Sequence, residues 1–121
     1  MSDFVNFELA QKLKEKGLNV PFYFYYRTDD KSLRHANVTN PLIYCDKIDD
    51  EVVIAPTISQ VLKWFREEKG IHVCIALGEF SDWMYDVSRI DGNMFCKAED
   101  GLKSYEQAAL ASIEYVLDNL I

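Results

Sequence analysis

Apolar residues recur at helical spacing in three parts of the chain. The first, Asn6–Gly17, starts at a good N-cap residue and ends on a glycine that fits a Schellman ending. The second, Thr57–Gly70, also ends on glycine. The third begins at Ser104, whose spacing to Gln107 is that of a capping box. We therefore expect three amphipathic helices. The apolar stripe of the second consists of Ile58, Val61, Leu62 and Phe65.

Alternation with a period of two predicts strands at 71–77 and 83–90. A tight turn at 91–93 leads from the second of these to a third strand at 94–97. Earlier in the chain, the aromatic run 22–26 is typical of a strand. Shorter strands are expected within 27–40 and at 41–45, while the pattern leaves the state of 52–54 open.

This order of elements predicts an α+β fold. Strands that follow one another through tight turns must be antiparallel. We expect a two-layer sandwich, mainly an antiparallel sheet with about three helices on one face. A length of 121 residues fits a single domain, 1–121. A similar order of helix, charged end, glycine and strand suggests a weak α–β repeat over about 6–55 and 56–121.

Charge narrows the classes of function. The chain has 13 basic and 20 acidic side chains, a net charge of −7. Residues 70–121 hold 3 of the basic and 9 of the acidic ones, so this half supplies −6. This balance disfavours direct binding to nucleic acid or to an anionic membrane surface. No apolar stretch is long enough for a transmembrane helix.

Cysteine usage and the first residues predict the compartment. The three cysteines, Cys45, Cys74 and Cys96, are odd in number and form no CxxC pair. The first residues include an acidic side chain, Asp3, and lack the apolar core of a signal peptide. We expect a cytoplasmic protein without a disulfide framework.

One combination of residues has the composition of a nucleophilic site. Aligning the two alternating strands by their apolar positions places Cys74 beside Asp86 and His72 beside Ser88, away from the helices. A small hydrolase or transferase that uses Cys74, His72 and Asp86 is therefore an alternative. Same-face neighbours along a strand are roughly 7 Å apart, however, too far for a nucleophile to bond its base directly.

Motifs for cofactors and metals are missing. The chain has no glycine-rich nucleotide loop, and only five glycines in all. Period-two alternation places Cys96 on the helix-facing side of the sheet, opposite to Cys74. No sequence spacing indicates His35 as a metal ligand. The acidic groups at 29–30 and 46–51 lack the order of a calcium loop. We expect no cofactor and no metal site.

The aromatic strand is hard to explain by packing alone. Phe22, Phe24 and Tyr26 share one face, while Tyr23 and Tyr25 share the other, so both faces are apolar. Segment 27–55, a second copy or protein partner, or a small ligand would have to cover the second face.

Three stretches carry a resemblance. They are FELAQKLKEKG near the start, PTISQVLKWFREEKGIHV at 56–73 and SYEQAALASIEYVLDNLI at the end. In these the chain resembles small proteins of phages, prophages and mobile elements of Bacteroides-like gut bacteria, a family without agreed catalytic residues. The resemblance implies a cytoplasmic accessory protein of a mobile element.

These observations favour a non-enzymatic protein that acts by protein interaction or self-association. The candidate binding residues are Tyr23, Tyr25, His72, Cys74 and Asp86. A further alternative is an acidic mimic that binds a basic partner.

Overall fold

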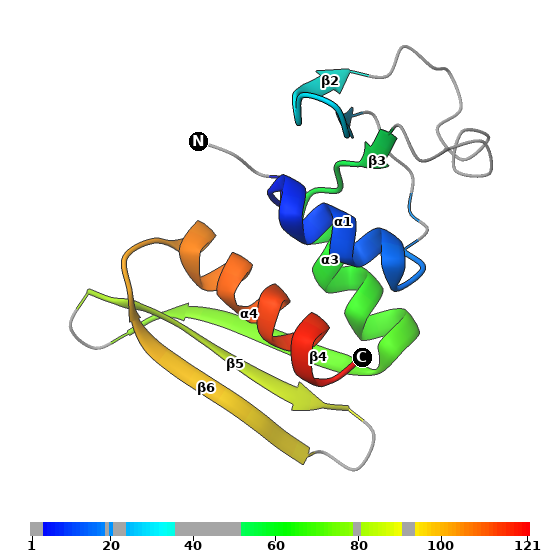
Figure 1. Cartoon of the computed structure of the whole chain (residues 1–121). Coiled ribbons are helices and arrows are strands. Elements are labelled where there is room, and N and C mark those ends of the chain that lie inside the picture. Colours follow the sequence, from blue (N-terminus) through cyan, green and yellow to red (C-terminus); the bar gives the residue numbers. More distant parts are fainter. Residues whose placement is uncertain (1–3, 19, 21–23, 36–51, 79–80, 91–93) are drawn as a thin grey trace.

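The computed structural model describes residues 4–18, 20, 24–35, 52–78, 81–90 and 94–121. Helices and strands alternate in groups along the chain (Figure 1). In chain order they are α1 (Phe7–Glu15), β1 (Phe24–Arg27), β2 (Leu33–His35), β3 (Val52–Ile54), α3 (Ile58–Trp64), the π-helix η1 (Phe65–Lys69), β4 (Ile71–Leu77), β5 (Trp83–Arg89), β6 (Met94–Leu102) and α4 (Tyr105–Asn119).

The predicted α+β class with antiparallel pairing is confirmed, and the strands form two separate sheets. One sheet has the order β2-β1-β3 and the other has the order β4-β5-β6. Figure 1 shows α4 along one face of the β4–β6 sheet, with α1 and α3 on the same side. The small sheet lies on the side of α1 that faces away from the β4–β6 sheet.

The first helix begins and ends as its sequence predicts. The Asn6 side chain accepts a hydrogen bond of 2.9 Å from the Leu9 N–H at the start of α1. At the other end, Gly17 takes a φ of +85°, and the Leu18 N–H donates to the Leu13 carbonyl at 3.0 Å. This 6→1 bond is the Schellman ending, so local chemistry alone sets both ends of α1.

The second helix starts at the predicted residue and ends in an unexpected form. Thr57 and Gln60 make a reciprocal capping box. The last turn, η1, is π-helical and closes at Gly70 with a φ of +65°. A π-turn accommodates one extra residue, which allows the consecutive side chains Trp64 and Phe65 both to be buried. The apolar stripe predicts a uniform α-helix and does not reveal this change.

The capping of α4 differs in one bond from a standard box. The Ser104 hydroxyl accepts from the Gln107 N–H at 3.1 Å, as predicted. The Gln107 side chain, however, accepts from the Lys103 N–H at 3.0 Å rather than from Ser104. The start of the helix is correct, but its reciprocal bond reaches one residue further back.

The last turn of α4 has no basic residue of its own. Basic side chains from segments distant in the sequence lie at this C-terminal end instead. Lys12 Nζ lies 3.0 Å from Asp118, and Lys16 Nζ donates to the Ile121 carbonyl at 2.7 Å. Arg89 approaches the Leu120 carbonyl at 3.4 Å. These cations complement the negative end of the helix dipole, so the ends of α1 and β5 are fixed against α4.

Strands β4 and β5 pair in the predicted register, and β6 is longer than predicted. The pairing of β4 with β5 is regular from Ile71–Arg89 to Leu77–Trp83. Strand β6 continues to Leu102 instead of ending at Lys97, with register shifts near both ends. Bulges interrupt the period-two pattern, and an edge strand tolerates charges, so the pattern ends too early.

Candidate functional site

The open face of the β4–β6 sheet holds the predicted site residues. It lies opposite the helices, and we call it the outer face. The outer-face residues are His72, Cys74, Ala76, Met84, Asp86, Ser88, Phe95, Ala98 and Asp100. The predicted neighbours are confirmed, since Cys74 pairs directly with Asp86 and His72 with Ser88.

His72, Cys74 and Asp86 are neighbours in the sheet, but they do not form the hydrogen-bonded arrangement of a nucleophilic site. His72 and Cys74 are exposed, and Asp86 is half-buried. Within the described ranges, no hydrogen bond or ion pair joins these three side chains. His72 and Cys74 are two residues apart on one strand, about 7 Å. The sheet thus brings the groups to one face without orienting a base toward the thiol.

A labelling experiment checks this geometry. We expect His72→Ala to leave the rate of Cys74 alkylation by iodoacetamide within about twofold of the wild-type rate, because the imidazole does not touch the sulfur. Mass spectrometry of the labelled peptide separates Cys74 from the half-buried Cys96. A tenfold slower reaction in the variant would show that His72 activates the thiol.

The outer face is apolar and acidic. Phe95 is 65% exposed although it is a large aromatic side chain. Asp86 and Asp100 supply negative charge, and none of the outer-face residues is Lys or Arg. An open depression of about 300 Å³ lies beside them, lined by Met84, Ala98, Glu99 and Asp100. Such a shallow surface suits contact with a macromolecule better than enclosure of a small substrate.

The helix side of the same sheet is structural. The buried Tyr85 hydroxyl donates to Glu99 at 3.1 Å. Burial, with this hydrogen bond, raises the pKa of Tyr85 to about 12. Lys97 Nζ lies 5.9 Å from the centre of the Tyr115 ring. Cys96 packs against the core, as its parity predicts, and is therefore on the opposite side from Cys74.

The aromatic strand β1 is not a free edge of its sheet. Tyr25 lies in β1, the central strand of the small sheet, opposite Arg34 on β2 and Ile54 on β3. It is half-buried, while Tyr23 lies outside the described residues. Because both edges of β1 are already paired, a partner cannot add to this strand by backbone pairing.

Side chains on the other face of β1 pack against the interior of the protein. The Phe24 ring lies 4.8 Å from Phe4 and 5.0 Å from His35, measured between ring centres. The Tyr26 hydroxyl donates to the Val5 carbonyl at 2.6 Å, and burial raises the pKa of Tyr26. His35 thus serves as an aromatic neighbour of this strand.

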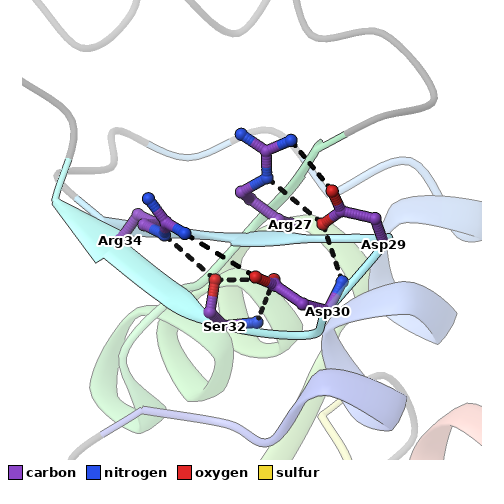
Figure 2. Close-up of polar contacts among 5 residues, drawn as sticks. All are labelled: Arg27, Asp29, Asp30, Ser32 and Arg34. Atoms are coloured by element: carbon purple, nitrogen blue, oxygen red, sulfur yellow. Dashed lines mark hydrogen bonds and ion pairs between the residues drawn. The ribbon is translucent and has the colours of Figure 1, made fainter.

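The acidic pair at 29–30 binds its own turn (Figure 2). Arg27 forms an ion pair of 2.9 Å with Asp29. Asp30 accepts from the Ser32 N–H at 3.0 Å and from the Ser32 hydroxyl at 2.7 Å. The Arg27 guanidinium and the Asp30 N–H lower the pKa of Asp29 to about 2. Both carboxylates stabilise the hairpin between β1 and β2. The acidic segment 46–51 lies outside the described residues.

The described residues contain no group of three His, Cys, Asp or Glu side chains that could hold a metal ion. None of the described helices is long and apolar enough to cross a membrane.

Comparison with protein-family models, curated proteins and solved structures gives no match to this chain. The resemblance to proteins of phages and mobile elements therefore stays a prediction.

Phe95 is the most prominent outer-face residue that the sequence pattern did not single out; Ala76, Met84, Ala98 and Asp100 are others. Cys96, the neighbour of Phe95, has helix-side parity, which assigns Phe95 to the opposite side. Alternation from Cys96 was therefore sufficient to place Phe95 on the outer face. The bulge at this position makes the inference less direct, since Phe95 pairs with Ser88 while Lys97 pairs with Val87.

Proposed function

We propose that the chain is a non-enzymatic interaction protein of the cytoplasm that binds a partner protein through the outer face. The supporting observation is Phe95, which is 65% exposed beside Ala98 on a sheet face without a described helix over it. Aromatic side chains in such positions are enriched in protein interfaces. The scattered geometry of His72, Cys74 and Asp86 favours binding over catalysis.

The charge of the face selects the class of partner. Asp86 and Asp100 flank the apolar positions without a Lys or Arg among the outer-face residues. The half of the sequence that contains the face also carries −6 of the net −7. A partner that combines basic and apolar side chains complements this surface, and the charges steer its approach. An accessory role in a mobile element is compatible with such binding and rests on the resemblance alone.

Selection from a random peptide library tests the proposal. We expect the wild-type protein to enrich peptides that combine Lys or Arg with aromatic or aliphatic residues. Phe95→Asp and Asp100→Lys should each weaken the binding of those peptides at least tenfold, because one removes the apolar contact and the other reverses a charge. Fluorescence anisotropy with the enriched peptides gives the affinities.

A matched control comes from the small sheet. Leu33 is 42% exposed on β2, so Leu33→Asp adds the same charge to an apolar surface position elsewhere. It should leave peptide affinity unchanged. Equal losses in Leu33→Asp and Phe95→Asp, or a selection that enriches nothing above background, would contradict the proposal.

A further inference from the structure

The two edges of the β4–β6 sheet differ in how well they are protected against the addition of another strand. Natural edge strands avoid unwanted pairing by means of charges and bulges. Strand β6 has both, with Lys97, Glu99 and Asp100 in its length and two register shifts against β5. Strand β4 contains no Lys, Arg, Asp or Glu and pairs with β5 without a shift. The β4 edge therefore lacks the features that block strand addition.

Hydrogen bonds at the ends of the β4–β5 pairing show which backbone groups face outward. The Gly78 N–H donates to the Asp82 carbonyl, and the Ile90 N–H donates to the Gly70 carbonyl. Even-numbered residues of β4 therefore turn their N–H and C=O groups toward β5, because these directions alternate along an antiparallel strand. Odd-numbered residues direct theirs to the open edge, where no described residue pairs with them.

Exposure limits the part of this edge that a second strand could reach. Ile71 is 0% exposed, so its outward groups are closed to a partner. Val73 and Ile75 are half-buried, and Leu77 is 60% exposed. The accessible outward groups thus belong to Val73, Ile75 and Leu77, and Ile75 lies at the centre of the accessible stretch.

We propose that β4 pairs antiparallel with β4 of a second copy of this chain, about a two-fold axis at Ile75. Ile75 then lies opposite its own counterpart, and Val73 lies opposite Leu77 of the second copy. All of these residues direct backbone groups to the open edge, so each pair can exchange two hydrogen bonds. The register is self-complementary, as a two-fold interface requires.

The side chains fit this register as well as the backbone does. The paired residues Val73, Ile75 and Leu77 are all apolar, with Val73 and Ile75 packed against the core. On the outer face, Cys74 lies opposite Ala76 of the second copy, and both side chains are small. The pairing joins two three-stranded sheets into one of six strands. It uses the strand edge, so it holds whether or not the outer face binds a partner.

Sedimentation equilibrium measures the association directly. We expect the wild-type mass to rise from monomer to dimer between low micromolar and millimolar concentration. Leu77→Lys should weaken the dimer at least tenfold, because it places a charge at the new junction. Met94→Lys is the matched control, since Met94 is also 60% exposed and begins the opposite edge strand. Its dissociation constant should stay within about twofold of wild type. A monomer at every concentration, or equal weakening by both variants, would overturn the proposal.

Disulfide trapping tests the register. In a chain with Cys45→Ser and Cys96→Ser, only Cys74 remains. Its counterpart in the dimer lies on a diagonal, about 7 to 8 Å away, which is too far for a disulfide. Adding Ala76→Cys places a thiol directly opposite, at a Cα separation of about 4.5 Å. We expect a covalent dimer on non-reducing gels only with the added Ala76→Cys. Cross-linking through Cys74 alone would instead place the axis at Cys74 and overturn this register.

Discussion

Phe65→Ala is expected to remove about 3 to 5 kcal/mol from the free energy of unfolding. Phe65 is 0% exposed at the junction of α3 and η1, with its ring centre 5.8 Å from that of Trp64. Deleting the ring leaves a cavity between elements that the sheet and α4 hold in place. Because a domain of this size has about 5 to 15 kcal/mol in total, the variant is close to unfolding. Urea denaturation followed by circular dichroism measures the loss.

Two variants make this measurement decisive. Phe95→Ala removes the same ring from a site that is 65% exposed, and it should change stability by less than about 0.5 kcal/mol. Phe65→Leu keeps most of the buried volume and should cost less than about 1.5 kcal/mol, so it remains measurable if Phe65→Ala does not fold. Equal losses at Phe65 and Phe95 would contradict the packing described for η1.

Removal of the Tyr85 hydroxyl is expected to change how stability depends on alkaline pH. The folded state raises the pKa of Tyr85 from 10.0 to about 12, so the unfolded chain loses this proton first. Stability is therefore fully present below pH 10 and falls as the pH rises toward 12. By pH 11.5 the wild-type protein should lose about 2 kcal/mol that Tyr85→Phe does not lose.

The two proteins should therefore cross in stability. At pH 7 to 9, Tyr85→Phe should be less stable by about 1 kcal/mol, because the hydrogen bond to Glu99 is absent. Near pH 11.5 it should be the more stable one. Tyr26, whose pKa is also raised, is present in both proteins, so its contribution cancels. A difference that stays constant across this pH range would show that the hydroxyl is not buried.

The parts of the fold set by local chemistry are the parts predictable from sequence. The caps at Asn6 and Thr57 and the glycine ending at Gly17 depend on residues within one turn of each other. The register that pairs Cys74 with Asp86 follows from matching apolar faces, since a slip of one residue would bury the wrong side. These features need no information about the rest of the molecule.

The features that could not be predicted depend on contacts between distant segments. The division into two sheets is set by β3 pairing with β1, and nothing in 52–54 reveals that partner. The π-turn η1 depends on the space available to Trp64 and Phe65. At the candidate site, the side of the sheet was predictable for the residues of β4 and β5. It was not predictable for Ala98 and Asp100, because the bulge near Cys96 shifts the register of β6. The exposure of Phe95 was not predictable either, because it depends on the helices leaving that face open.

The contact between α1 and α4 has a consequence for the order in which the molecule folds. Strands β4 to β6 and α4 follow one another in the chain, so their pairing closes short loops. The bond from Lys16 to Ile121 spans 105 residues and forms only after α1 and the end of α4 are in place. Closing short loops costs less chain entropy than closing long ones. We therefore expect α1 to dock last, onto a unit of β4 to β6 and α4 that has already formed.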